Sequence, residues 1–96
     1  MNPRENETGV RHHVAASRFE VEIDGRLAVA EYEKREGVMT MTHTLVPPEL
    51  RGRGLAEKLV RAALEHARAE KLRVVPACSY VATFIQRHKE YQALVS

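Results

Sequence analysis

The chain has 96 residues, of which 44% are hydrophobic and 29% are charged, and its formal net charge is +2. This length and composition predict one small globular domain and exclude a chain that is disordered throughout. No apolar run approaches the roughly 20 residues of a bilayer-spanning helix, and residues 1–7 lack a signal-peptide core, so we expect no membrane partner. The single cysteine, Cys78, excludes an internal disulfide and fits a reducing compartment, so we expect a cytoplasmic protein.

The first half of the chain predicts strands. Residues 1–13 show no sustained periodicity and are predicted to form a flexible tail, followed by a single domain over residues 14–96. Apolar and acidic residues alternate over residues 19–24, which is the pattern of a half-exposed strand. Asp24-Gly25 then predicts a tight hairpin, and a second strand is expected over residues 26–33.

A third strand is predicted over residues 38–46, after a charged turn. Its side chains should alternate between the two faces of the sheet. We therefore expect one face to carry Met39, Met41, His43 and Leu45, and the other to carry Thr40, Thr42 and Thr44.

The second half predicts helices around one more strand. Helical spacing of apolar residues extends from about residue 55 to residue 71, and residues 72–77 form a short apolar run typical of a strand. This strand should lie parallel to the third one, because a right-handed helical crossover joins them. Ser79 is the expected N-cap of a second helix over residues 80–88, and residues 91–95 should dock the C-terminal segment.

The segment before the long helix has the features of an anion site. Gly52 and Gly54 allow the main chain to approach a ligand closely, and the start of a helix presents unpaired N–H groups at its positive end. Charge favours the same region. Residues 1–50 hold six Lys/Arg and nine Asp/Glu, a net charge of −3, whereas residues 51–96 hold nine and four, a net charge of +5. A solvated basic helix face is the alternative explanation of this excess.

The residue sequence of the turn excludes two common classes of phosphate-binding loop. The loop of nucleoside triphosphatases needs Lys-Ser or Lys-Thr where this chain has Leu55-Ala56. The dinucleotide-binding fingerprint needs a third glycine, which this turn lacks. What remains, Arg51-x-x-Gly54-x-Ala56 between a strand and a helix, resembles the acetyl-coenzyme A pyrophosphate loop of the GNAT superfamily of N-acetyltransferases.

Three further motifs resemble the small, stand-alone YjdJ-type branch of that superfamily. They are His43-Thr44-x-Val46-Pro47, Pro76-x-Cys78-x-Tyr80-Val81 and Arg87-His88-x-x-Tyr91. The resemblance covers roughly residues 15–95 and implies an α/β fold with a mixed sheet, a minimal GNAT-like core. In this fold antiparallel strands precede a β-α-β crossover whose parallel strands splay apart, and a C-terminal helix follows. From the sequence we do not expect the pair of N-terminal helices that often walls the acceptor site in this superfamily.

The resemblance implies acetyl-CoA as cosubstrate and an amine, on a small molecule or a protein, as acceptor. It places the pyrophosphate on a run of backbone amides: Arg51, Gly52, Arg53, Gly54, Leu55 and Ala56. Main-chain groups of Leu45 and Val46 would hold the pantetheine arm. Arg87 and His88 can attract the 3′-phosphate, or can simply end a solvated helix.

Acetyl transfer needs a deprotonated amine and a proton for the leaving thiolate. His43 is a candidate base and Tyr80 a candidate acid. Cys78 can protonate the thiolate or accept the acetyl group itself. Each has a structural alternative: a packed strand histidine, a core tyrosine and a small buried hydrophobe.

Other classes of function receive little support. The histidines lack metal-ligand spacing with Cys78, so we expect no metal. The two Arg-Gly pairs between Arg51 and Gly54 are too few, and too poor in aromatic neighbours, for us to expect nucleic-acid binding. The main alternative to an N-acetyltransferase is a non-catalytic or regulatory module that binds coenzyme A, because the acceptor wall is missing.

Overall fold

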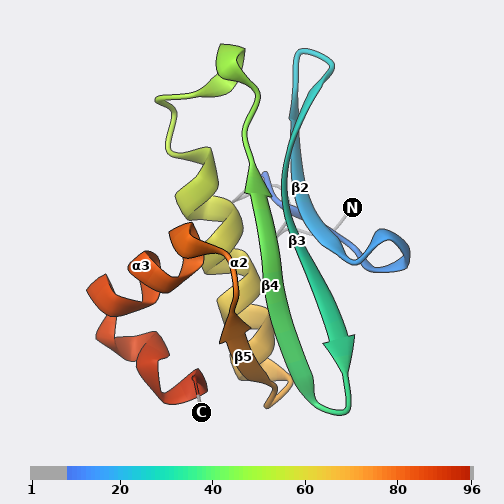
Figure 1. Cartoon of the computed structure of the whole chain (residues 1–96). Coiled ribbons are helices and arrows are strands. Elements are labelled where there is room, and N and C mark those ends of the chain that lie inside the picture. The colour runs from blue at the N-terminus through green and yellow to red at the C-terminus, as the bar shows by residue number, and fades with distance from the viewer. Residues whose placement is uncertain (1–8, 96) are drawn as a thin grey trace.

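The computed structural model describes residues 9–95, which form a mixed five-stranded sheet with two helices (Figure 1). In sheet order the strands are β1 (Arg11–His13), β2 (Arg18–Ile23), β3 (Arg26–Arg35), β4 (Val38–Leu45) and β5 (Arg73–Pro76). The helices are α2 (Leu55–Ala69) and α3 (Ser79–Arg87), and short 3-10 segments form η1 (Val14–Ala16), η2 (Pro48–Leu50) and η3 (Lys89–Leu94). Neighbouring strands are antiparallel except β4 and β5, which are parallel and joined through α2. The predicted fold class is confirmed.

Two tight turns join β2 to β3 and β3 to β4 as antiparallel hairpins. Asp24 and Gly25 have φ angles of 52° and 76°, and Glu36 and Gly37 have φ angles of 50° and 79°. Two consecutive positive φ angles match the twist of the flanking strands, which is why Asp-Gly is a strong hairpin signal. The predicted hairpin at Asp24-Gly25 is confirmed.

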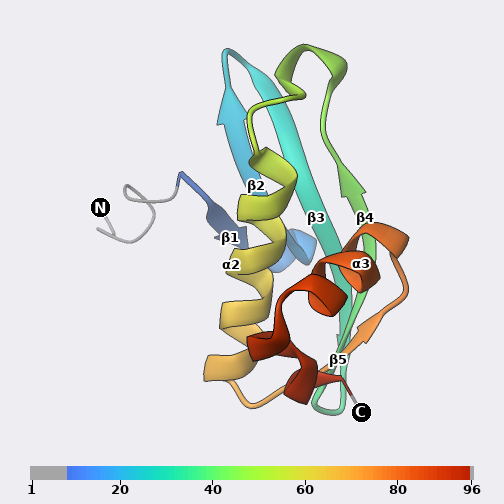
Figure 2. The ribbon, with the colours of Figure 1, turned by 90° about the vertical axis from the view of Figure 1, so that its left-hand side faces the viewer.

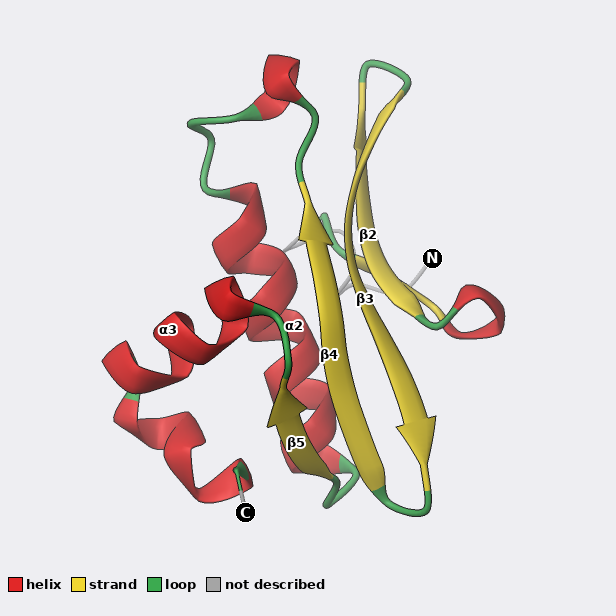
Figure 3. Cartoon of the chain, in the orientation of Figure 1, coloured by secondary structure: helices red, strands yellow, loops and turns green. Residues whose placement is uncertain are grey.

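Both helices cover the same face of the sheet (Figures 2 and 3). Helix α2 packs across β2, β3, β4 and β5, and α3 packs against β4 and β5. We call this side the helix-covered face. The opposite side, the helix-free face, carries no α-helix among the described residues.

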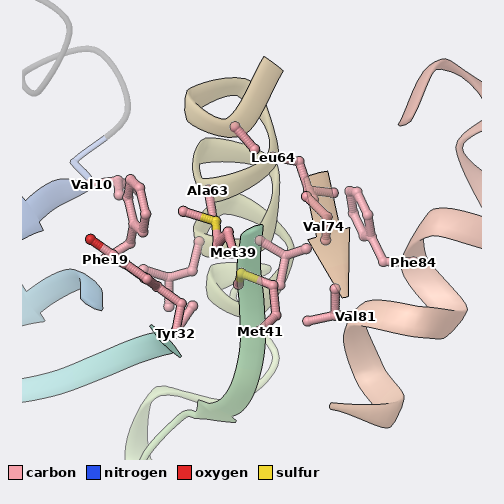
Figure 4. Close-up of a cluster of buried hydrophobic side chains, with 14 of the residues drawn as sticks. Val10, Phe19, Tyr32, Met39, Met41, Ala63, Leu64, Val74, Val81 and Phe84 are labelled. Atoms are coloured by element: carbon pink, nitrogen blue, oxygen red, sulfur yellow. The ribbon is translucent and has the colours of Figure 1, made fainter. Parts of the chain in front are cut away.

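The core lies between the sheet and the helices. Met39 and Met41 of β4 are 0% exposed, as are Leu59 and Leu64 of α2. Figure 4 shows the methionine side chains in the layer between β4 and α2. Burial of each such side chain contributes about 2 kcal/mol to folding, so the core fixes β4 firmly against α2.

Several element boundaries differ from the sequence prediction. Residues 11–13, expected in the tail, form β1 and pair with residues 18–20 of β2; residues 1–8 of that tail lie outside the described residues. Helix α2 ends at Ala69, and β5 covers only residues 73–76. A strand as short as β1 shows no alternation that a sequence pattern can reveal.

A β-bulge in β4 is the main departure from prediction. Tyr32 of β3 is opposite Met41, whereas the preceding residue Glu31 is opposite His43, so Thr42 is an extra residue. Residues directly opposite each other in a sheet share a face, and an extra residue shifts the alternation beyond it.

The faces of β4 therefore change after Met41. Thr44 is opposite Ala30, a fully buried core residue, and so points to the helix-covered face. His43, opposite Glu31, points to the helix-free face. The expectation that His43 and Leu45 share a face with Met39 and Met41 is wrong, because the bulge inverts the alternation between the two pairs.

Candidate active site

The parallel strands β4 and β5 separate at Met41. They pair from Val38 to Met41 along β4, and the last link is the Cys78 N–H, which donates to the Met41 carbonyl at 2.9 Å. Pro76 ends β5, and the next residue, Ala77, donates its N–H back to the Val75 carbonyl at 3.0 Å. Strand β4 continues to Leu45, whereas the segment that follows β5 turns away from β4 and enters α3 (Figure 1). Within the described residues, the free edge of β4 beyond Met41 thus has no strand beside it.

An open pocket of about 480 Å³ lies at this end of β4. It is lined by Leu27, Thr44, Leu45, Val46, Pro47, Arg51, Ala56 and Tyr80. The structure thus brings together four residues predicted to bind the cofactor (Leu45, Val46, Arg51 and Ala56) and one candidate acid (Tyr80). The sequence analysis assigned no role to Leu27 or Thr44.

The glycine turn beside this pocket leaves the start of α2 uncapped. Gly52 and Gly54 have φ angles of 83° and 73°, which glycine adopts at little cost. Gly54 is the N-cap, no side chain caps the helix, and the first helical bond runs from Lys58 N–H to Gly54 O at 3.2 Å. A Cβ at either glycine would meet no atom within 4 Å. Free amides, a positive helix end and open space together form a suitable environment for an anion.

Arg51 connects the turn to the end of β4. Its Nε donates a hydrogen bond of 3.1 Å to the Val46 carbonyl. Val46 is one of the two residues whose main-chain groups are predicted to hold the pantetheine arm. A ligand amide that binds to the Val46 carbonyl therefore competes with the guanidinium group for this acceptor.

Cys78 is half-buried beside the point where the strands separate. Its extended backbone occupies the cap position of α3, with φ −77° and ψ 129°, so the prediction of Ser79 as N-cap is wrong. The Cys78 Sγ lies 3.6 Å from the Thr44 hydroxyl. The bond from the Cys78 amide to Met41 holds the residue in an extended conformation, which displaces the helix start by one residue.

The surroundings of Cys78 favour its thiolate. Burial raises the pKa of the thiol, but the Val81 amide, the Thr44 hydroxyl and then the Tyr80 amide outweigh it, so the pKa lies below its ordinary value. The two α3 amides face the sulfur without closing a capping hydrogen bond. A lowered pKa increases the thiolate fraction near neutral pH.

His43 lies in a different environment. Its side chain is 67% exposed on the helix-free face, and its Nδ1 is 3.6 Å from Glu31 Oε1. Cys78, in contrast, contacts Thr44, which points to the helix-covered face. His43 and Cys78 therefore lie on opposite sides of β4.

Tyr80 lies in the first turn of α3 and is 41% exposed at the pocket. Burial raises the pKa of its hydroxyl, Glu57 raises it further, and Arg87 opposes both. The hydroxyl thus keeps its proton at neutral pH and suits the role of an acid.

Arg87 and His88 lie at the other end of α3 from Cys78. The His88 Nδ1 donates to the Phe84 carbonyl at 2.7 Å, and its ring stacks on Phe84 with centroids 3.9 Å apart. The His88 ring is therefore held within its own helix end, and a contact of either residue with the 3′-phosphate stays a prediction.

The described part of the chain contains no group of three or more His, Cys, Asp or Glu side chains arranged to hold a metal ion. No helix in it has the length and apolar character required to cross a membrane.

Known proteins share sequence similarity with most of this chain. The sequence model of the GCN5-related N-acetyltransferase family matches residues 18–94. Protein NATD1 from Bos taurus is 36% identical over 84 residues, which cover 82% of this chain and 73% of the relative. The human protein NATD1 is 33% identical over 84 residues, with the same two coverages.

A solved structure shares the fold. The NMR structure of a GCN5-like candidate N-acetyltransferase from Staphylococcus aureus superposes with a TM-score of 0.72 at 27% identity. The match covers 91% of this chain and 86% of the other. On the family match, the relatives and the fold, this chain belongs to the GCN5-related N-acetyltransferase family.

Proposed function

We propose that this protein transfers the acetyl group of acetyl-CoA to an amine on a small molecule or a protein. Membership of the family supports acetyl transfer as the general activity. The observation that carries the specific proposal is the separation of β4 from β5 beside a pocket that reaches the uncapped start of α2. A cytoplasmic location remains our expectation, since the free Cys78 suits a reducing compartment.

The residues present fit coenzyme A as a ligand. The amides at the start of α2 suit a pyrophosphate, and the exposed Arg51 and Arg53 add positive charge beside them. The free edge of β4 near Leu45 and Val46 suits the amide groups of a pantetheine arm, which pair with main-chain groups as a strand does.

Cys78 is the candidate for the chemistry at the thioester. In one route it donates its proton to the departing thiolate while the amine attacks the carbonyl. In the other, the Cys78 thiolate attacks the carbonyl and coenzyme A leaves as its thiolate. The amine then attacks the acetyl group on Cys78, a new N–C bond replaces the S–C bond, and the proton lost by the amine neutralises a released thiolate. The lowered pKa of Cys78 favours the second route.

His43 and Tyr80 have separate proposed roles. His43 is exposed on the helix-free face, and this exposure supports a role as the base for an amine that approaches from that side. Tyr80 lines the pocket and can supply a proton there.

A coenzyme A-binding module without catalysis is the second candidate. Only the 3-10 segment η1 separates β1 from β2, so no helix stands on the helix-free face of the described residues to enclose an acceptor. An exposed site favours binding over efficient turnover, since enzymes usually exclude water from the reacting atoms.

Calorimetry with coenzyme A, followed by free-thiol release from acetyl-CoA across a panel of amines, separates the two candidates. We expect binding and amine-dependent release. Binding without release on any amine would favour the module, and no binding would remove both.

Replacement of Cys78 by alanine tests the chemistry. We expect Cys78→Ala to lower turnover by at least about tenfold, as for loss of a proton-transfer or nucleophilic group, with little change in coenzyme A affinity. Intact mass spectrometry of the wild type with acetyl-CoA alone should detect an added acetyl group that the variant lacks. Unchanged turnover would assign Cys78 to packing.

A further inference from the structure

Thr44 lies where β4 leaves β5, and its hydroxyl is 3.6 Å from the Cys78 sulfur. Two features fix this contact. The bulge at Thr42 turns Thr44 to the helix-covered face, and the bond from the Cys78 amide to the Met41 carbonyl holds Cys78 against the same strand. The contact thus bridges the two elements at the point where they part.

We propose that Thr44 is a positioning residue for Cys78, and that its hydroxyl donates a hydrogen bond that holds the sulfur as a thiolate. The use of that thiolate in acetyl transfer rests on the proposed function; the hydrogen bond itself does not.

The proton balance of the pair explains the effect. When the sulfur is protonated, its S–H can donate to the Thr44 oxygen; after it loses that proton to solvent, the Thr44 O–H donates to the sulfur instead. A hydrogen bond to a charged acceptor is stronger than one between neutral groups. The hydroxyl therefore stabilises the thiolate more than the thiol.

Threonine suits this task at a strand position. Its β-branched side chain has restricted χ1 freedom, so little entropy is lost when the hydroxyl is aimed at a neighbour. Thr42, two residues earlier, aims its hydroxyl at the Glu31 carbonyl at 3.2 Å. The hydroxyl at position 44 is therefore the one in β4 that the structure directs to a reactive side chain.

The electrostatics agree with the geometry. The Thr44 hydroxyl is the second of the groups that lower the pKa of Cys78, after the Val81 amide and against the effect of burial. Removal of the hydroxyl should therefore make the thiol less acidic without uncovering the sulfur.

The test measures reaction of the full chain with dithiodipyridine, a neutral disulfide, as a function of pH. The Cys78 thiolate attacks one sulfur of the reagent and pyridinethione leaves, so the rate is read from absorbance with no coenzyme A present. Thr44→Val removes the hydroxyl and keeps the shape, Thr44→Ser keeps the hydroxyl, and Thr40→Val makes the same change on the helix-free face as a control.

We expect the plots of reaction rate against pH for Thr44→Val and for the wild type to cross. Where the sulfur is mostly protonated, loss of one hydrogen bond to a charged group lowers the thiolate fraction about tenfold. A less acidic thiol is intrinsically about threefold more nucleophilic, so the net rate falls about threefold. On the alkaline plateau, where both proteins are fully ionised, the variant should react about threefold faster. Thr44→Ser and Thr40→Val should follow the wild type.

A structural change alone would not produce that crossing. Greater exposure of Cys78 would raise the rate at every pH, and either a uniform change or an unchanged curve would overturn the proposal. Thr44→Ala, which also lacks the hydroxyl, must show the same crossing and serves if Thr44→Val does not fold. If the wild type transfers no acetyl group, the rates with dithiodipyridine are unaffected. The proposed role of Thr44 and the proposed acetyl transfer can therefore be refuted independently.

Discussion

The buried carboxylate of Glu20 should hold β1 on the sheet, and Glu20→Gln tests this with almost no change of shape. The Glu20 side chain is 3% exposed on the helix-free face. It accepts a hydrogen bond of 2.7 Å from Arg18 Nε and one of 3.0 Å from Arg11 Nε, and His13 Nδ1 lies 3.5 Å away. Arg11 and His13 are both in β1.

The size of the effect follows from the pKa of this carboxyl group. Burial would raise it, but hydrogen bonds from Arg18 and Arg11, with the charge of Arg11 and a contact from His13, lower it from 4.5 to about 2. At about 1.36 kcal/mol per pKa unit, this difference corresponds to about 3 kcal/mol of stability. Because the folded-state pKa is depressed, the contribution is complete above about pH 4.5 and is lost as the pH falls towards 2.

Urea unfolding of wild type and Glu20→Gln over this pH range measures the difference. We expect the variant to be about 3 kcal/mol less stable at neutral pH, with the gap closing as the pH falls towards 2. Glu22→Gln, an exposed position on the same strand and face, is the matched control and should cost less than about 0.5 kcal/mol. A gap that stays constant with pH would refute the electrostatic explanation and leave only packing.

Three further predictions concern the site and the N-terminal strand. Gly54→Glu should abolish coenzyme A binding in calorimetry, because it adds bulk and negative charge where phosphate is expected. Gly37→Glu, with a similar φ of 79° in a distant hairpin, should retain binding; equal losses would point to misfolding. Arg51→Met should bind phosphate-free pantetheine about fivefold more tightly, since the guanidinium group no longer competes for the Val46 carbonyl, yet bind coenzyme A more weakly. Opposite changes in the affinities for pantetheine and coenzyme A support this competition, and changes in the same direction contradict it. Burial lowers the pKa of His12, so the wild type should lose stability relative to His12→Phe as the pH falls below 6.5. A difference in unfolding free energy between the wild type and His12→Phe that stays constant with pH would contradict this prediction.

Local chemistry made much of the fold predictable from sequence. Asp24-Gly25 specified its hairpin because few other dipeptides adopt two positive φ angles. The apolar spacing from Leu55 onward specified α2, since the same residues form its buried face. The glycine turn was identified for a similar reason, because Gly52 and Gly54 adopt conformations that other residues rarely do.

Features that depend on long-range contacts could not be predicted. Residues 39–45 alternate without interruption in the sequence, so nothing there signals the bulge, which arises only when β4 pairs with β3. The side chains of Arg11 and His13 in β1 contact Glu20, a residue of the next strand. The role of Thr44 was missed for the same reason, because its partner Cys78 is 34 residues away.

The bulge also sets what kinds of change β4 can accept. One additional residue alters the phase of the strand, so neighbours in sequence, His43 and Thr44, emerge on opposite surfaces. Exchange of residue types along β4 preserves that phase, whereas loss or gain of a single residue reverses it and swaps the two surfaces. Length, more than composition, should therefore be the constrained property of this strand.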